Sequence, residues 1–180
     1  MAGWVVRAST EDDWEAYRAL RFEMLEDAPI AFLETLEQAR MHPDEHWRRR
    51  ASNVNRTTRL FAAVAEDGRW LGSMGGFQSA GSHDPYLVGV YVTPGWRGRE
   101  LGMTDALLDA VIDWARGRGE RLLLEVHEDN EPAIRSYLRR GFTFTGRTQP
   151  YPLDRTANER EMALPLDAPA PPGSATPSAE

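Results

Sequence analysis

The segment from Tyr86 to Ala115 places the strongest constraint on the fold, because a strand, a loop and a helix follow one another without interruption. Tyr86–Val92 is a run of apolar and aromatic residues typical of a strand, and Thr93-Pro94-Gly95 ends it. After the loop from Trp96 to Leu101, apolar residues recur at helical spacing from about Gly102 to Ala115. The sequence therefore predicts a strand–loop–helix unit of an α/β fold.

The remaining elements follow from the spacing of apolar residues and from the turn residues between them. Glu66-Asp67-Gly68-Arg69 reads as a hairpin turn, and Gly72, Gly75 and Gly76 suggest a bulge or a close backbone approach in the strand after it. Further strands are expected at Trp4–Val6, Leu60–Ala65, Trp70–Phe77, Leu122–Val126, Phe142–Thr145 and Arg160–Leu164, and helices after Ser9-Thr10, within residues 30–53 and from Asn130 to Gly141.

Composition excludes several kinds of chemistry. All 21 basic residues are arginines, so a lysine Schiff base and a P-loop are excluded. The absence of Cys excludes disulfides, thiolate zinc sites and cysteine nucleophiles. A net charge of −7 argues against nucleic acid or an anionic membrane as a partner. His42 and His46 are the one close histidine pair, which is weak evidence for zinc, so we expect no metal.

The length of 180 residues fits a single domain, which we expect over residues 1–166. Residues 167–180 are rich in Pro, Ala and Ser and are expected to form a disordered tail. The N-terminus lacks the apolar core of a signal peptide. The longest apolar run, Leu60–Ala65, is far shorter than the ~20 residues that span a bilayer. We therefore expect a cytoplasmic protein.

The loop between Trp96 and Gly102 has a composition that suits an anion. Such a loop points successive backbone N–H groups and a helix N-terminus at one spot, which favours a bound phosphate or pyrophosphate. Arg97 and Arg99 add positive charge there. On these residues alone, a tight turn with two solvated arginines fits equally well.

A second segment, Leu124–Phe142, adds Asn130, Ala133, Tyr137 and Gly141-Phe142 to the pattern. Together the two segments resemble the GNAT superfamily of acetyl-CoA-dependent N-acetyltransferases, whose signature pairs a V-x-P-x-x-R-G-x-G-x-G loop with an N-x-x-A-x-x-x-Y-x-x-x-G-F helix. The match is close over residues 86–144 and weaker over residues 4–166. It implies the α/β (α+β) GNAT fold, a single mixed, mostly antiparallel sheet of about seven strands flanked by about four helices.

The resemblance implies acetyl-CoA as co-substrate and assigns roles by position. Asn130 would bond the pantetheine or the acetyl end, Tyr137 would protonate the departing CoA thiolate, and Glu125 stands where some members place a general base. The other cofactor contacts, from one strand and the loop after it, would come from Val90, Tyr91, Val92, Arg97, Gly98, Arg99, Glu100, Leu101, Gly102 and Met103.

These residue types suit the chemistry on independent grounds. An amine must lose a proton before it attacks a thioester, and Glu125, or His127 on the same strand, could accept that proton. A phenol of pKa about 10 can protonate a thiolate whose thiol has a pKa of about 8.5, which is the role open to Tyr137. Without the resemblance, Tyr137 reads as a core aromatic residue and Glu125 as a solvent-facing one.

One residue departs from the family pattern, since Glu100 stands where the loop has its first glycine. If that position requires a positive φ, a side chain there costs about 1 kcal/mol or more, and a carboxylate also repels a pyrophosphate. We expect cofactor binding to survive, with Glu100 pointing outward. The departure keeps a second hypothesis open, namely a catalytically weak module that binds acyl-CoA.

The acceptor is predicted from the distribution of charge. Residues 11–45 hold 11 acids and three arginines, and in the expected fold they flank the acceptor entrance. Glu23, Glu26 and Asp27 are therefore expected to bind a cationic small-molecule amine. The C-terminal residues 151–166 look like the end of the ribosomal-protein-alanine acetyltransferases, which keeps a peptide N-terminus open as the acceptor. Arg48-Arg49-Arg50 reads as a solvated helix face or a contact to the cofactor 3′-phosphate, and a homodimer is left open.

Overall fold

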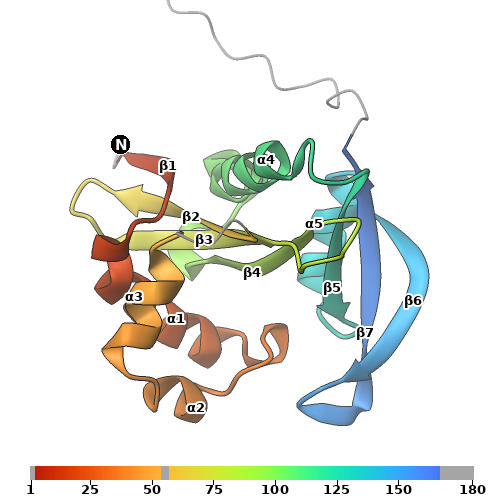
Figure 1. Cartoon of the computed structure of the whole chain (residues 1–180), viewed down its shortest axis with the longest axis horizontal. Coiled ribbons are helices and arrows are strands. Elements are labelled where there is room, and N and C mark those ends of the chain that lie inside the picture. Colours follow the sequence, from red (N-terminus) through yellow and green to blue (C-terminus); the bar gives the residue numbers. More distant parts are fainter. Residues whose placement is uncertain (1–2, 54–56, 167–180) are drawn as a thin grey trace, which may run out of the picture.

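Seven strands form one sheet in the computed structural model, which describes residues 3–53 and 57–166 (Figure 1). The strands are β1 (Trp4–Ala8), β2 (Thr58–Ala65), β3 (Trp70–Phe77), β4 (Tyr86–Val92), β5 (Arg121–His127), β6 (Thr143–Tyr151) and β7 (Asp154–Pro165). Their order in the sheet is β1-β2-β3-β4-β5-β7-β6, and every neighbouring pair is antiparallel except β4 with β5. The predicted mixed, mostly antiparallel sheet is confirmed.

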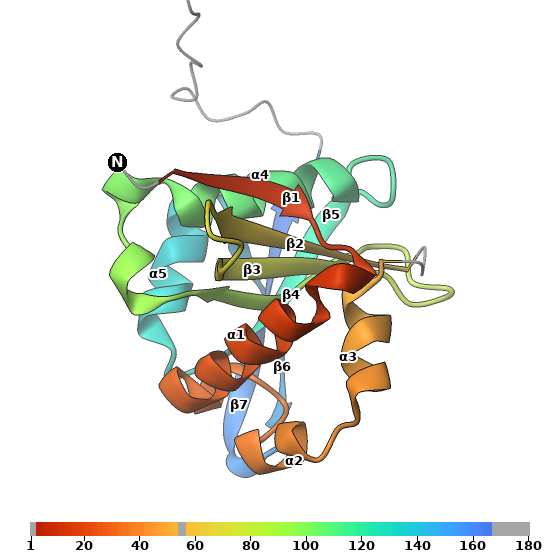
Figure 2. The same cartoon turned by 90° about the vertical axis from the view of Figure 1, so that its left-hand side faces the viewer.

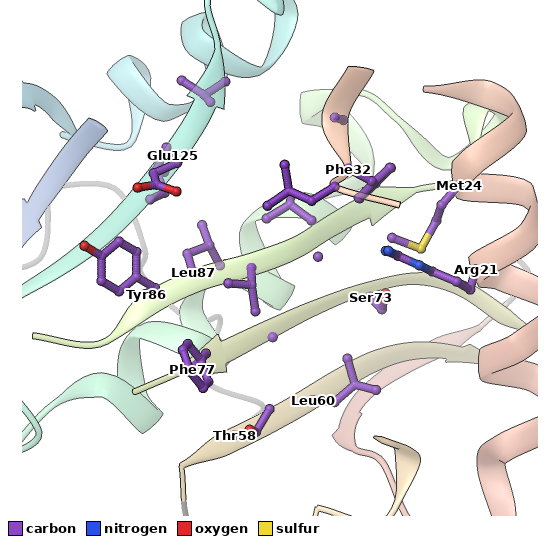
Figure 3. A pocket seen from close by; sticks show the side chains of 18 of the residues that line it. Arg21, Met24, Phe32, Thr58, Leu60, Ser73, Phe77, Tyr86, Leu87 and Glu125 are labelled. Carbon is purple, nitrogen blue, oxygen red and sulfur yellow. The ribbon is translucent and has the colours of Figure 1, made fainter. Parts of the chain in front are cut away.

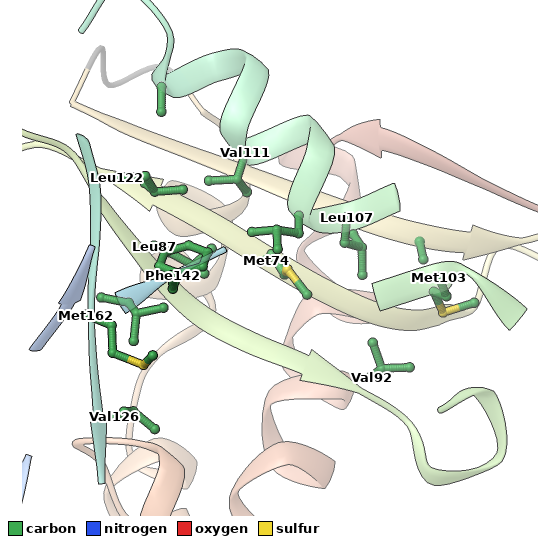
Figure 4. Packing of buried hydrophobic residues seen from close by; sticks show 14 of the residues in the cluster. Met74, Leu87, Val92, Met103, Leu107, Val111, Leu122, Val126, Phe142 and Met162 are labelled. Atoms are coloured by element: carbon green, nitrogen blue, oxygen red, sulfur yellow. The ribbon is translucent and has the colours of Figure 1, made fainter. Parts of the chain in front are cut away.

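The helices cover both faces of this sheet. They are α1 (Trp14–Asp27), α2 (Leu36–Arg40), α3 (Asp44–Ala51), α4 (Met103–Ala115) and α5 (Glu131–Arg139). On one face, α4 buries Leu107 and Val111 against Met74 of β3 (Figure 4). On the other face, α1 and α3 bury Tyr17 and Trp47, and Figure 2 shows α1 to α3 on the side of the sheet away from α4. The sheet is therefore the middle of three layers.

The strands β4 and β5 separate as soon as they meet. They are parallel and share a single register pair, Tyr86 with Leu123. On its other side β4 pairs with β3, and the register shifts at a bulge where Gly89 adopts a φ of 59°. The edge of β4 that faces β5 beyond Tyr86 therefore has no strand partner, and a wedge opens between the two strands.

Two regions differ from the sequence-based expectation. The helical region within residues 30–53 is divided, because Thr35 caps a short α2 and Pro43 precedes α3, so five α-helices flank the sheet instead of about four. The strands β6 and β7 are longer than the predicted 142–145 and 160–164. Most residues of β6 are exposed, so its sequence lacks the apolar alternation that reveals a strand.

No helix in the described part of the chain is long and apolar enough to cross a membrane. The tail that we predicted to be disordered, residues 167–180, lies outside the described residues. The boundary of the predicted domain at residue 166 stays a prediction.

Candidate active site

A cavity of about 790 Å³ lies at the wedge between β4 and β5. One wall comes from β5, β7 and α5, and the opposite wall from α1, α3 and the segment between α1 and α2. Figure 3 shows Glu125 on one side and Arg21 and Met24 on the other, with Phe32 and Leu87 between them. Of the residues that the sequence singled out, those that line this cavity include Val90, Glu125, His127, Asn130 and Tyr137, and also Gly75, Arg49 and Arg50.

Asn130 starts α5 and faces the cavity. Its Oδ1 accepts a hydrogen bond from the Ala133 N–H at 3.4 Å, so the predicted helix cap is confirmed. Its side-chain nitrogen has no hydrogen-bond partner in the described part of the chain, which leaves a donor for a ligand. Val90, beside the bulge of β4, lines the same space and brings the unpaired strand edge to it.

Tyr137 lies two helical turns after Asn130 on α5 and also lines the cavity. Its ring is half-buried and packs 5.6 Å from the ring of Phe142. Burial raises the pKa of the phenol above its ordinary value. Among the described residues nothing bonds its hydroxyl, so the side chain presents a protonated, unpaired O–H to the cavity.

Glu125 lies on β5, and two other carboxylates, Glu159 and Glu161 of β7, stand close to it. Burial raises its pKa first, and the negative charges of Glu159 and Glu161 on β7 raise it further. Arg147 acts in the opposite direction and pairs with Glu161 at 3.0 Å. A carboxylate with a raised pKa is a stronger base than an ordinary one, which suits proton abstraction.

His127 is the other candidate base, and its hydrogen bonding argues against that role. The ring is buried, with 6% of the residue exposed, and its Nδ1 accepts the backbone N–H of Asp129 at 3.2 Å. A backbone N–H can only donate, so the neutral ring carries its proton on Nε2. His127 therefore offers the cavity a hydrogen-bond donor, and Glu125 is left as the acceptor of protons on β5.

The loop after β4 lies beyond the far end of that strand, outside the lining of the cavity. The positive φ angles are at Gly98 (125°) and Gly102 (66°), and Glu100 is not among the described residues with positive φ. Glu100 carries no left-handed strain. Its exposed carboxylate folds back over Gly98, 2.5 Å from where a Cβ on that glycine would stand. The loop residues Gly98, Arg99, Glu100, Leu101, Gly102 and Met103 lead into the N-terminus of α4.

Arg97 fastens this loop to α1. Its Nε donates to the carbonyl oxygen of Val92 at 2.7 Å, its guanidinium pairs with Asp27, and the same group lies 5.3 Å from the ring centre of Tyr91. Arg99 is exposed and meets no carboxylate in the described part of the chain. Of the two loop arginines, Arg99 is the one left available for a phosphate.

A family model of the acetyltransferase (GNAT) family matches residues 14–142. The chain belongs to this family. The match spans both segments that carried the resemblance.

Relatives of this GNAT chain include a streptothricin acetyltransferase and a nourseothricin acetyltransferase. A streptothricin acetyltransferase from Streptomyces lavendulae is 36% identical over 122 residues, which are 67% of this chain and 63% of that protein. A nourseothricin acetyltransferase of known structure is 30% identical with a TM-score of 0.55, covering 61% of this chain and 66% of that one. The yncA protein from Salmonella typhimurium, solved with acetyl-CoA, shares the fold at 19% identity and a TM-score of 0.71, covering 97% and 100%.

The three acids expected at the acceptor entrance are engaged elsewhere in this GNAT domain. Glu23 accepts a hydrogen bond from the hydroxyl of Tyr91 at 3.0 Å, Glu26 pairs with Arg40 at 3.3 Å, and Asp27 pairs with Arg97. None of the three is among the residues that line the cavity. Other acids of residues 11–45 also pair with arginines of the same region: Asp44 with Arg18, and Glu34 with Arg21.

Sequence reasoning singled out Glu125 and His127 but missed the acids that face them. Glu159 stands opposite His127, and Glu161 opposite Glu125, in the register of β5 and β7, and Glu159 also lines the cavity. The predicted strands, 122–126 and 160–164, stopped short of His127 and Glu159, and the sequence did not show that these strands would pair. On the facing wall Arg21 was missed, whereas Arg49 and Arg50 belong to the run expected as a solvated helix face or a contact to the cofactor 3′-phosphate.

Proposed function

We propose that the chain is an acetyl-CoA-dependent N-acetyltransferase that acts on the primary amine of a small molecule. The observation that carries this proposal is the single cavity that joins the β4/β5 wedge, an unpaired tyrosine hydroxyl and a carboxylate of raised pKa. The chain matches 63% of the length of its streptothricin acetyltransferase relative, so its own acceptor is part of the proposal.

The chain has the groups that acetyl-CoA needs. The unpaired edge of β4 offers carbonyl and N–H groups to the amides of the pantetheine arm, and Asn130 offers a side-chain donor. The N-terminus of α4 supplies backbone N–H groups for the pyrophosphate, with Arg99 in the loop before it. When bound, acetyl-CoA supplies the activated acetyl group as a thioester.

The residues of the chain handle the protons of the transfer. Glu125 takes a proton from the ammonium form of the acceptor, directly or through water, so that the nitrogen lone pair can attack. Tyr137, which its raised pKa keeps protonated, gives its phenolic proton to the sulfur that leaves, and the second proton released by the attacking nitrogen replaces it as the amide forms. No covalent intermediate on the protein is required.

The alternative, a weak module that binds acyl-CoA, was suggested by Glu100, which stands where the family loop has a glycine. Because Glu100 has no positive φ, its side chain does not strain the loop, and the alternative loses its main support. A peptide N-terminus remains a comparison acceptor for the experiment below.

The test combines binding and turnover. Calorimetry of the purified chain with acetyl-CoA should give saturable binding, and release of CoA thiol should follow on addition of small primary amines, with N-terminal peptides as the comparison. Absence of acetyl-CoA binding would refute the proposal. Binding without thiol release from any amine or peptide would leave only a binding module.

A further inference from the structure

We infer that the acceptor carries an anionic group, a carboxylate, as well as the amine that is acetylated, and that Arg49 and Arg50 bind it while the carboxylate wall faces the amine. This inference rests on the proposed function and names its substrate class, a dipolar molecule of the amino-acid kind. It follows from opposite charges on the two walls of the cavity.

The wall formed by β5 and β7 is negative. Glu125 and Glu159 line the cavity, and Glu161 lies directly opposite Glu125 in the strand register. Arg147 is the basic residue that pairs with this group, through Glu161. Three carboxylates against one guanidinium leave a net negative corner beside the base, where an ammonium group is favoured.

The wall formed by α1 and α3 is positive. Arg21 is buried, with 7% of the residue exposed. Its Nε and Nη2 both donate hydrogen bonds to Glu34, at 3.1 and 2.9 Å, and these bonds hold the guanidinium in place. Arg49 and Arg50 line the same wall, and neither meets a carboxylate within ion-pair distance in the described part of the chain. Three guanidinium groups thus face one carboxylate, and two of them, on exposed residues that line the cavity, have no ion-pair partner in the described part of the chain, although that of Arg50 lies 5.8 Å from the ring centre of Tyr17.

His46, on the same helix as Arg49 and Arg50, also has positive charge near it. Burial lowers the pKa of His46 first, and the nearby His42 and Arg50 lower it further, to about 4. His46 is therefore neutral at pH 7 and adds no charge of its own. Between the two charged walls lies an apolar band that includes Phe32 and Leu87 (Figure 3).

The position of these arginines separates them from the phosphates of the cofactor. Residue Thr58 of β2 pairs with Phe77, which pairs with Tyr86, so the start of β2 and the start of β4 lie at the same end of the sheet. Asn53, just after α3, bonds the backbone of Leu60 at that end. The loop proposed to bind the pyrophosphate, residues 98–103, follows the other end of β4, seven residues or about 20 Å away. The arginines of α3 therefore serve the acceptor.

The experiment compares acceptors that differ only in the carboxylate. The purified chain is given acetyl-CoA with L-leucine or leucinamide, and with L-lysine or cadaverine. We expect kcat/KM to be about tenfold or more higher for the member with the carboxylate, the size of a charge-assisted contact. Equal rates within both pairs would overturn the inference while leaving the acetyltransferase proposal intact.

Variants on one helix locate the effect. Arg49→Gln with Arg50→Gln should raise KM for L-leucine about tenfold and leave kcat/KM for leucinamide unchanged. The matched control is Arg48→Gln, whose guanidinium lies over the ring of Trp14 at 4.5 Å and does not line the cavity. A loss shared equally by leucine and leucinamide would contradict a carboxylate contact.

A binding measurement covers the case of slow turnover on these acceptors. N-acetyl-L-leucine, the product, should raise the melting temperature of the wild type and of Arg48→Gln, and should fail to do so in the double variant, while N-acetyl-leucinamide should have little effect on any of them. If N-acetyl-L-leucine stabilises none of the proteins, or stabilises the double variant equally, the inference is wrong. Failure of acetyl-CoA itself to bind would instead refute the proposed function.

Discussion

Glu125 of β5 and Glu161 of β7 face each other directly in an antiparallel register, so two carboxylates stand side by side on one face of the sheet. Burial and the charges of Glu159 and Glu161 raise the pKa of Glu125. Thr145 and Arg147 donate hydrogen bonds to the carboxylate oxygens of Glu161, at 2.8 and 3.0 Å, and hold this side chain in place. The base is therefore tuned by a neighbour that need not touch the acceptor.

Replacing Glu161 by Gln should move the acid limb of the pH profile of kcat/KM to lower pH. Glu125 must be ionised to take a proton, and the negative charge of Glu161 opposes that ionisation, so removing the charge lowers the pKa of Glu125. Glu37→Gln, an exposed residue of α2, is the control and should leave the limb in place. An unchanged limb in Glu161→Gln would show that Glu125 is not the titrating base.

Replacing Tyr137 by Phe should lower kcat by roughly 10²-fold, the usual loss on removing a general acid. Its stability should stay close to that of the wild type, because the hydroxyl has no partner in the described part of the chain. Tyr151→Phe is the counterpart, since that hydroxyl donates to the Phe32 carbonyl at 2.8 Å and its loss should cost about 1 kcal/mol of unfolding free energy. Steady-state kinetics and thermal melts of both variants decide the matter, and a fully active Tyr137→Phe would contradict the assigned role.

Replacing Glu100 by Gln should tighten acetyl-CoA binding modestly, by about twofold at low salt, because a carboxylate near the pyrophosphate is removed. The gain should disappear at high ionic strength, where screening suppresses the repulsion. Glu100→Gly should bind no more tightly than Glu100→Gln, since position 100 has no positive φ for a glycine to relieve. Calorimetry at two salt concentrations measures both effects, and a salt-independent change would require another explanation.

Replacing Gly76 by Ala should destabilise the fold by about 1–3 kcal/mol, the usual cost of overpacking. A Cβ on Gly76 would overlap the ring of Trp114 on α4, which packs flat against the strand there. Gly95→Ala is the matched control, because a Cβ at that position meets nothing within 4 Å and its φ is not positive. Denaturant unfolding of the two variants should separate them clearly, and equal stabilities would contradict the close approach.

Local signals in the sequence predicted a large part of this structure. Asn130 was found because a cap and its helix are set by residues within ten positions of each other, and Tyr137 was found through the family motif that the same helix carries. The charged walls of the cavity were not found, because Glu161 meets Glu125 only through the pairing of β5 with β7, and Arg49 reaches the cavity only through the packing of α3. Such long-range neighbours follow from the register of the whole sheet.

The glycines of β3 show the same limit on a smaller scale. We expected Gly72, Gly75 and Gly76 to mark a bulge or a close approach, and the structure shows close approach for Gly76 beneath Trp114. The bulge at the cavity lies on the neighbouring strand, at Gly89, where the left-handed φ turns the backbone. The sequence showed that small residues were needed in this region, and the partner strand determined for which purpose.

The single pair between Tyr86 and Leu123 has a consequence for how the molecule holds together. It divides the sheet into a block of β1 to β4 and a block of β5, β7 and β6, joined at this point by little backbone bonding. Amide hydrogens along an unpaired strand edge exchange readily with solvent. A pantetheine arm bonded to that edge would add hydrogen bonds at the gap between the two blocks. Its binding should therefore slow amide exchange and increase resistance to proteolysis.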